Sequence, residues 1–450
     1  MKEVVLTHGY FLNEDEKEKG IMRPYPTLGL LYISAYLKKH KKRVSVVDST
    51  FMSREEWQNA ILEEQPSILA FYSNLVTKVT LLQIRDWVAK ELPDCRLVIG
   101  GPDVRYNLEN YLKAGFEFAV IGEGEQTMLE LCEALGSNSK IDNIQGIAYL
   151  KEGVPHENAE RLKIKEIAEL PFPDCDAIDM EKYLSVWQKH HGKRTLNIST
   201  QRGCPYTCKW CSTAVYGQSY RRNSPERVVE EIIGLRKAYD VEALWFVDDV
   251  FTVSHKWISK LHKQFIQADL KIDFECISRA ERLNEDILLK LREMGCFRIW
   301  IGAESGSQRI IDKMDRRVDV ETVQSTIRLA QKLGIEAGTF IMVGYPEEEH
   351  EDILQTMKHI ERCNPSVLTL TKAYPIKGTD LYDEVESGII DPLPWTTSSD
   401  RDIRFELPYS DSYYNNAIRY LMNGWQANKT GKLLPKIKQK VALWNMKRMR

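Results

Sequence analysis

Short apolar runs alternate with longer amphipathic runs over the first 135 or so residues of the chain. The apolar runs have the length of strands, and the stretches between them carry apolar residues at the spacing of a helix face. Alternation at this interval predicts a parallel sheet covered by helices on both faces. The predicted strands are 3–8, 43–49, 67–73, 95–101 and 118–122, and the predicted helices include 28–40, 54–65 and 80–92.

Five such units fit a flavodoxin-like doubly wound domain over residues 1–136, whose ligand lies over the carboxyl ends of the strands. The residues at or just past those ends include Thr7, His8, Ser73, Gly100, Gly101 and Gly122. Small residues there let the backbone approach a large ligand closely, although tight turns without a ligand would use the same glycines. No G-x-G-x-x-G follows the first strand, so we expect no ordinary dinucleotide site.

A second alternating series begins at residue 195. Its predicted strands are 196–200, 242–247, 271–277, 297–305, 335–344 and 365–370, and helices such as 226–239 and 320–334 lie between them. Six such units predict a partial parallel barrel over residues 195–390, with its chemistry at the carboxyl-end rim. Residues 137–194 are expected to form a linker with a small strand pair, and residues 391–450 a small, mostly helical domain.

Composition narrows the class of protein. The 450 residues carry a net charge of −3 and nine cysteines, and no apolar run approaches the roughly 20 residues that span a bilayer. The N-terminus has no apolar secretion segment, so we expect a cytoplasmic protein with reduced thiols. The charge balance argues against a nucleic-acid partner.

The segment 432–450 departs from this balance, since it holds seven Lys or Arg residues and no acid. We favour a terminal helix whose basic face is solvated. The alternative is a contact with an acidic partner or, peripherally, with an anionic membrane surface.

Three cysteines crowd into the stretch RGCPYTCKWCS, directly after the first strand of the second series. Cys204, Cys208 and Cys211 have the spacing C-x3-C-x2-C, and Gly203 and Pro205 favour a loop. Three thiolates of this kind can hold an iron–sulfur cluster that leaves one iron open. Zinc is less favoured because no fourth Cys or His stands at helpful spacing, and buried structural cysteines would not cluster in such a loop.

The cysteine loop resembles the signature of the radical S-adenosylmethionine (SAM) superfamily, with Trp210 in its aromatic position. Together with the first domain, the chain is similar to the class of that superfamily with an N-terminal cobalamin-binding domain. The resemblance covers roughly residues 1–390 and includes RPYPTLGLLYISAYL, VIGGPD, IGEGE, FVDDVFT, IGAESGSQRIIDKMDR and FIMVGYPEE, in that order.

The resemblance implies three cofactors: a 4Fe-4S cluster on Cys204, Cys208 and Cys211, SAM on its open iron, and cobalamin. One electron from the cluster would cleave SAM to methionine and a 5′-deoxyadenosyl radical. The residues implied for SAM are Trp210, Asp248, Asp249, Arg279, Glu304, Ser305 and Gly344. For cobalamin they are Thr7, His8, Ser73, Gly100, Gly101 and Gly122, and no D-x-H-x-x-G motif offers an axial histidine. One of the two aspartates could instead cap the helix that follows them.

The implied activity is methyl transfer to an unactivated carbon or phosphorus centre of a small molecule or peptide, with a flavodoxin- or ferredoxin-type electron donor. A radical oxidoreductase or cyclase without methyl transfer is the alternative. A methylthiotransferase is less favoured, because it needs a second cluster on three N-terminal cysteines. Of the cysteines available, Cys95 begins a predicted strand, Cys132 lies within a helix-like stretch and Cys175 lies in the linker. A non-catalytic redox protein is also less favoured, because it would not need charged residues at several strand ends.

Overall fold

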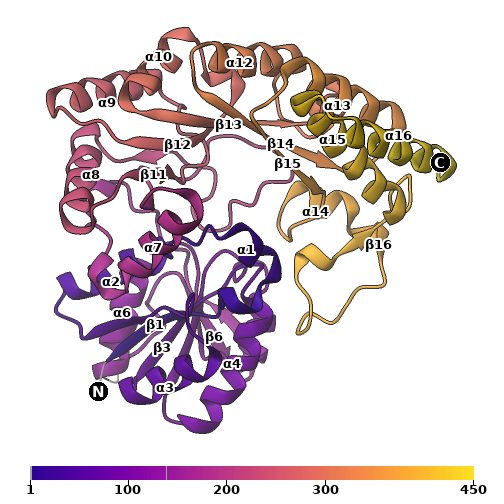
Figure 1. The fold of residues 1–450 in the computed structure, drawn as a ribbon. Helices are drawn as coiled ribbons and strands as arrows, with labels where there is room; N and C mark the ends of the chain where they lie inside the picture. The colour runs from indigo at the N-terminus through magenta and orange to yellow at the C-terminus, as the bar shows by residue number, and fades with distance from the viewer. Residues whose placement is uncertain (1–2, 138) are drawn as a thin grey trace. The chain divides into compact units, whose positions relative to one another are not determined.

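The computed structural model describes residues 3–137 and 139–450 of the chain. It divides into two compact units, which are drawn in Figure 1. The first unit comprises Met1–Pro205, Ser212–Glu242 and Leu393–Asp402, and the second comprises Tyr206–Cys211, Ala243–Pro392 and Ile403–Arg450.

The first unit is built on a seven-stranded sheet in the order β2-β1-β3-β4-β5-β6-β7. Its strands are β1 (Val4–His8), β2 (Val44–Val47), β3 (Ile68–Tyr72), β4 (Arg96–Gly100), β5 (Phe118–Val120), β6 (Ile147–Lys151) and β7 (Val154–Glu157). The first five are parallel, and β6 and β7 add an antiparallel hairpin at one edge. The order 2-1-3-4-5 is that of flavodoxin-like sheets, which confirms the predicted doubly wound fold.

Helices cover both faces of this sheet because successive strand residues point to opposite sides. Val5 packs in an apolar cluster with α3 and α4, whereas Val4 and Leu6 pack in a second cluster with α2 and α6. The helices of the unit are α1 (Glu16–Ile21), α2 (Leu28–Lys39), α3 (Arg54–Glu64), α4 (Lys78–Glu91), α5 (Leu108–Lys113), α6 (Gly124–Ser137), α7 (Met180–His191) and α8 (Pro225–Tyr239). The unit also contains β8 (Thr195–Ile198), β9 (Gln201–Arg202) and β10 (Arg221–Arg222).

The stretch predicted as a linker contains a well-formed helix, α7. Asp179 caps it by accepting a hydrogen bond from the Lys182 amide, and Gly192 ends it with a positive φ of 79°. Its buried side chains include Tyr183 and Trp187, and the Trp187 indole donates to the Pro24 carbonyl at 2.7 Å. The helical pattern of apolar residues in α7 was not recognised from the sequence, because prolines and charged residues before residue 180 dominate the composition of the segment.

The second unit holds five parallel strands in the order β15-β14-β13-β12-β11. They are β11 (Ala243–Phe246), β12 (Asp273–Ser278), β13 (Cys296–Glu304), β14 (Glu336–Val343) and β15 (Val367–Lys372), each close to a predicted strand. The helices are α9 (His255–Gln267), α10 (Glu285–Met294), α11 (Gln308–Lys313), α12 (Val320–Lys332), α13 (His350–Cys363), α14 (Asp380–Val385), α15 (Asp411–Thr430) and α16 (Leu433–Arg448). A short strand pair, β16 (Ile389–Ile390) and β17 (Arg404–Phe405), precedes the last two helices. The expected helical C-terminus is thus present, and none of the described helices is long and apolar enough to cross a membrane.

Candidate functional site

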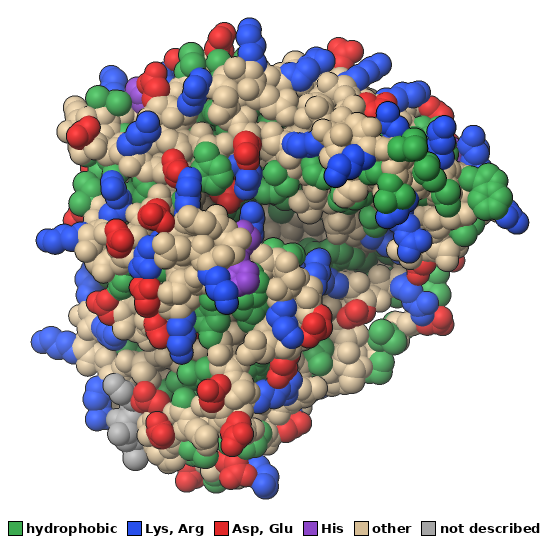
Figure 2. Space-filling view, viewed as in Figure 1, with side chains coloured by type: hydrophobic (Ala, Val, Ile, Leu, Met, Phe, Trp, Pro, Cys, Tyr) green, Lys and Arg blue, Asp and Glu red, His purple; other side chains and the backbone are tan. Residues whose placement is uncertain are grey.

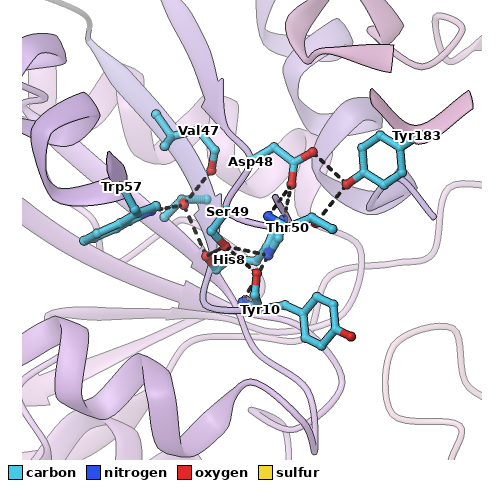
Figure 3. A network of polar contacts seen from close by, with 9 residues as sticks. His8, Tyr10, Val47, Asp48, Ser49, Thr50, Trp57 and Tyr183 are labelled. Atoms are coloured by element: carbon cyan, nitrogen blue, oxygen red, sulfur yellow. Dashed lines mark hydrogen bonds and ion pairs between the residues drawn. The ribbon is translucent and has the colours of Figure 1, made fainter. Parts of the chain in front are cut away.

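His8 lies at the carboxyl end of β1, at the centre of a polar network (Figure 3). Its Nδ1 accepts a hydrogen bond from the Tyr10 amide at 3.2 Å, so the proton is on Nε2, which donates to Asp48 Oδ1 at 2.8 Å. The Ser49 hydroxyl lies 3.1 Å from Nδ1 and donates to the His8 carbonyl at 2.7 Å. Both ring nitrogens of His8 are therefore engaged with the chain itself.

Asp48 connects this network to α7. Its Oδ2 accepts a hydrogen bond from the Tyr183 hydroxyl at 2.7 Å, and its Oδ1 accepts one from the Thr50 amide at 3.1 Å. Burial raises the pKa of Asp48, but the bonds from His8 and Tyr183 outweigh it and bring the pKa to about 2. The carboxylate is charged and satisfied, so the network holds the β1 and β2 ends in place.

Three more of the predicted cobalamin residues are engaged inside the unit. The Thr7 hydroxyl donates to the Val47 carbonyl at 2.7 Å and accepts from the Trp57 indole at 2.9 Å. Ser73 Oγ lies 2.6 Å from the Tyr111 hydroxyl. Gly101 has a φ of 111°, and a Cβ there would come within 2.3 Å of the Ser73 carbonyl oxygen.

The other two glycines differ from Gly101. A Cβ on Gly100 would meet Val120 only at an ordinary distance of 3.5 Å. Gly122 has a φ of 80° with open space around it, since a Cβ would meet only the Val215 carbonyl oxygen, at 3.8 Å. Gly122 also lines a cavity of about 150 Å³ within the first unit. It is the predicted glycine that leaves room for a ligand.

A buried ion network that the sequence reading missed joins the Gly122 loop to the start of the cysteine loop. Arg202 is 6% exposed and pairs with Glu123 at 2.6 Å and with Glu125 at 2.5 Å. Arg221 also pairs with Glu123, at 2.6 Å. The residues of this network stand in motifs that the sequence analysis singled out. Glu123 and Glu125 alternate with glycines in IGEGE, and Arg202 directly precedes Gly203 of the cysteine loop.

The cysteine loop makes contacts in each of the two units. In the first unit, Gly203 has a φ of 84°, a Cβ on it would clash with the Ser219 carbonyl oxygen, and Cys204 forms a bridge with Gln218. In the second unit, the Cys211 amide donates to the Cys208 carbonyl at 3.0 Å. All three cysteines are free thiols with some solvent exposure.

The part of the loop in the second unit is anchored to two helices and their neighbours. The Lys209 amide donates to the Met314 carbonyl, and the Leu381 amide donates to the Lys209 carbonyl. Trp210 packs against the apolar cluster that contains Met314 and Leu381, and the Thr207 hydroxyl donates to Asp315 at 2.8 Å. Trp210 thus has a packing role in addition to any contact with adenine.

Arg279, just past the end of β12, reaches the cysteine loop. The side chain is buried, and its Nη1 lies 3.3 Å from the Cys208 sulfur. Its guanidinium also lies 4.0 Å from the centre of the Tyr206 ring and pairs with Glu281. Arg279 therefore places a buried positive charge beside the Cys208 sulfur.

Glu304 ends β13 in a strained conformation near two arginines. Its φ is 61°, and the pairing between β13 and β14 shifts register between Gly302 and Glu304. Burial raises the pKa of Glu304 to about 7 against the opposing charges of Arg316 and Arg279. Arg316 donates to the Gly302 carbonyl at 3.1 Å, while its buried Nη1 has no hydrogen-bond partner. Nη1 lies 4.0 Å from Glu281. Backbone strain at a strand end, with a buried donor nearby that makes no hydrogen bond, is typical of a ligand site.

The remaining predicted SAM residues lie on neighbouring strand ends. Neither Asp248 nor Asp249 caps α9, since Ser254 takes that position, and burial followed by the charge of Asp248 raises the pKa of Asp249. The Ser305 hydroxyl is buried, 3.3 Å from that of Thr356 in α13.

Gly344 was also predicted to bind SAM. It has a φ of 75°, and its amide donates to Glu348 at 2.6 Å. Burial raises the pKa of that carboxyl to about 8. Glu348 went unnoticed in the sequence because it lies among other acids, in PEEEH.

The geometry of the other cysteines counts against a second cluster. Cys95 packs with the apolar cluster on one face of the first sheet, and Cys132 lies in the cluster on the opposite face. Burial raises the pKa of Cys132 and of Cys175 to about 12. Among the described residues, no group of three His, Cys, Asp or Glu side chains converges on one metal position. A cubane does not require such convergence, because each thiolate binds a different iron.

Two family models match the chain. Residues 198–360 match the Radical SAM superfamily, and residues 22–132 match the B12 binding domain. The matches identify residues 198–360 as a radical SAM domain and residues 22–132 as a B12-binding domain. The cofactors of the chain are therefore a 4Fe-4S cluster, SAM and cobalamin. The three free thiols, of which Cys208 lies beside Arg279, and the open Gly122 turn fit these groups.

Known relatives agree with this assignment. The uncharacterized methyltransferase PH0819 of Pyrococcus horikoshii is 28% identical over 365 residues, which cover 80% of this chain and 78% of the relative. Cytidylyl-2-hydroxyethylphosphonate methyltransferase of Streptomyces wedmorensis is 27% identical and covers 82% of this chain and 79% of its own length. The cobalamin-dependent SAM radical enzyme OxsB has the same fold, with a TM-score of 0.78 at 18% identity, covering 94% of this chain and 66% of that one. This chain thus spans about two thirds of OxsB.

Proposed function

We propose that the chain is a cobalamin-dependent radical SAM methyltransferase that acts on an unactivated carbon or phosphorus centre. The observation that carries the proposal is the combination, in one chain, of a B12-binding domain with a cysteine loop whose Cys208 thiol contacts a buried arginine. The names of two relatives, both methyltransferases, support methyl transfer as the outcome.

In this proposal Cys204, Cys208 and Cys211 hold the cluster. Arg279 lies beside the Cys208 sulfur and presents a guanidinium to the SAM carboxylate, because its planar fork suits that group. When bound, the cluster and cobalamin supply the electron that cleaves SAM and the carrier of the methyl group. The protein's own contribution is to position SAM and to exclude water.

The other residues of the second rim complete the proposed SAM site. Asp248 and Asp249 accept hydrogen bonds from the SAM ammonium group, and Glu304 accepts them from the ribose hydroxyls. Arg316, whose Nη1 has no hydrogen-bond partner, supplies a positive charge close to Glu304. Trp210, Ser305 and Gly344 line the nucleoside in this proposal.

Within the first unit, we propose that cobalamin lies over the carboxyl ends of the strands, where Gly122 has open space. Thr7, His8, Ser73, Gly100 and Gly101 shape that surface in the proposal. His8 takes part through its network with Asp48, because both of its nitrogens are already engaged.

The proposed setting is a cytoplasmic enzyme that takes a small molecule or peptide as substrate. Its electrons come from a flavodoxin- or ferredoxin-type donor. The alternative is a radical oxidoreductase or cyclase with the same cofactors. The products separate the two, because methyl transfer from SAM yields S-adenosylhomocysteine and a cyclase does not.

The cysteine assignment is tested by replacing Cys204, Cys208 and Cys211 with Ala and measuring iron content and 5′-deoxyadenosine after anaerobic reconstitution. We expect the variant to lose both the iron and the 5′-deoxyadenosine, while its circular dichroism shows that the first unit is still folded. The matched control is Cys95→Ser with Cys175→Ser, which should keep both signals. Reductive cleavage of SAM by the triple variant would refute the assignment, and loss of iron in the control would favour a second cluster.

A further inference from the structure

Helix α16 has one face packed against the protein. Ala442 and Met446 are buried there, and the Asn445 amide donates to Asn416 of α15 at 3.1 Å. The packing against α15 is close, since a Cβ on Gly424 of α15 would come within 2.5 Å of the Gln439 side chain. The orientation of α16 about its own axis is therefore set by this contact.

The opposite face of α16 exposes an apolar stripe. We define the apolar stripe as Leu433 (72% exposed), Leu434 (61%), Ile437 (49%), Val441 (53%) and Trp444 (57%). Residues three, four and seven apart lie on the same side of a helix, so these side chains form a continuous band. A solvated helix face would not carry five large apolar side chains in a row.

Basic side chains border the apolar stripe. Lys436, Lys440 and Lys447 follow one edge and Lys438 the other, and all four are exposed. The segment 432–450 contains no acid, and the Arg448 guanidinium lies 4.5 Å from the centre of the Trp444 ring. Figure 2 shows hydrophobic side chains among Lys and Arg side chains over α16.

We propose that the apolar stripe of α16 docks on the surface of an anionic lipid bilayer, with the helix lying in the plane of the interface. Lys side chains on both edges can extend to the phosphate groups while their stems and the stripe contact the acyl region. A tryptophan among them is typical of the interface. A protein partner is disfavoured because protein interfaces are depleted of lysine. The proposal thus takes the peripheral membrane contact, the alternative weighed from the sequence, over a merely solvated basic face.

The first experiment measures cosedimentation of the full chain with vesicles of phosphatidylcholine, with and without one quarter phosphatidylserine. We expect binding to the anionic vesicles that weakens with added salt, because exposed charges are screened. Ile437→Ser with Val441→Ser and Trp444→Ser should reduce binding about tenfold or more, as should Lys436→Glu with Lys440→Glu. The matched control is Ile266→Ser with Leu289→Ser, two exposed apolar residues outside α16, which should bind normally.

A second readout places the stripe in the lipid. The fluorescence of Trp444 is obtained by subtracting the emission of the Trp444→Phe variant from that of the wild type. Brominated lipids should quench this Trp444 fluorescence. Folding is followed for each variant by thermal melting. No binding to anionic vesicles by folded wild-type protein would overturn the proposal, as would normal binding by the stripe variant. Capture of an acidic polypeptide, or dimerisation in light scattering, without vesicle binding would assign the stripe to a protein contact and equally overturn it.

Discussion

The strand ends of the two units use their polar residues in different ways. At the ends of β1 and β2 in the first unit, His8 and Asp48 satisfy each other and their neighbours. Near the end of β13 in the second unit, the buried Nη1 of Arg316 makes an ion pair with Glu281 at 4.0 Å but has no hydrogen-bond partner, and Glu304 has a positive φ. A polar residue at a strand end is therefore weak evidence of a ligand contact. A buried donor that has no hydrogen-bond partner is stronger evidence of a ligand contact.

The comparison is tested most strongly at Arg279. Arg279→Leu should lower the rate of 5′-deoxyadenosine formation by about 100-fold or more, since it removes the buried cation beside Cys208 and leaves Glu281 with the longer pair to Arg316, at 4.0 Å. The measurement is the initial rate of nucleoside release by reconstituted enzyme. Arg419→Gln is the control, because this arginine of α15 belongs to the same unit and is exposed. Equal rates in the Arg279 variant and the wild type would contradict the proposed role.

The next effect is on stability, in the buried network of the first unit. Arg202→Leu should lower the free energy of unfolding by about 3–5 kcal/mol, because buried Glu125 loses the arginine paired with it and buried Glu123 keeps Arg221 but loses Arg202. Arg96→Gln, which removes a pair between two exposed side chains, Arg96 and Glu117, should cost about 1 kcal/mol or less. Denaturant unfolding of both variants checks the ranking, and equal losses would mean that the Arg202 network is not a structural junction.

The smallest expected effect comes from Asp48, and it depends on pH. The pKa of Asp48 is lowered to about 2 in the folded state, below its ordinary value of 3.8, so its contribution to stability is present above pH 4 and is lost as the pH falls toward 2. Asp48→Asn should cost about 2 kcal/mol at pH 7, and the difference from the wild type should shrink below pH 4. Urea unfolding at several pH values tests this, with the exposed Asp86→Asn as control. A difference that does not change with pH would contradict the charged network.

The sequence predicted the elements more reliably than the contacts. Every predicted strand of the two series has a counterpart in the structure, because buried parallel strands are short apolar runs bounded by turns. Helix α7 was missed because its apolar positions follow a stretch rich in charge and proline. The pairing of Arg202 with Glu123 and Glu125 joins residues nearly 80 positions apart, which no local pattern reveals.

The C-terminal helix α16 also shows that the sequence predicts an element more reliably than its contacts. Counting charges in residues 432–450 found the basic residues but could not say which apolar residues face away from the protein. That follows from the contact with α15, which buries Ala442 and Met446 and leaves Val441 and Trp444 exposed. The spacing C-x3-C-x2-C, by contrast, is a local pattern, so the cluster loop could be recognised from sequence alone.

The central claim is that one chain holds both a 4Fe-4S cluster and cobalamin and uses them for methyl transfer. The most direct measurement is on protein reconstituted without oxygen with iron, sulfide and hydroxocobalamin and then desalted. Bound iron and corrinoid are assayed, followed by 5′-deoxyadenosine and S-adenosylhomocysteine after addition of SAM and reductant. We predict four irons and one corrinoid per chain, with both products formed once an acceptor is present. Four irons without corrinoid would contradict the methyltransferase proposal and leave radical chemistry alone.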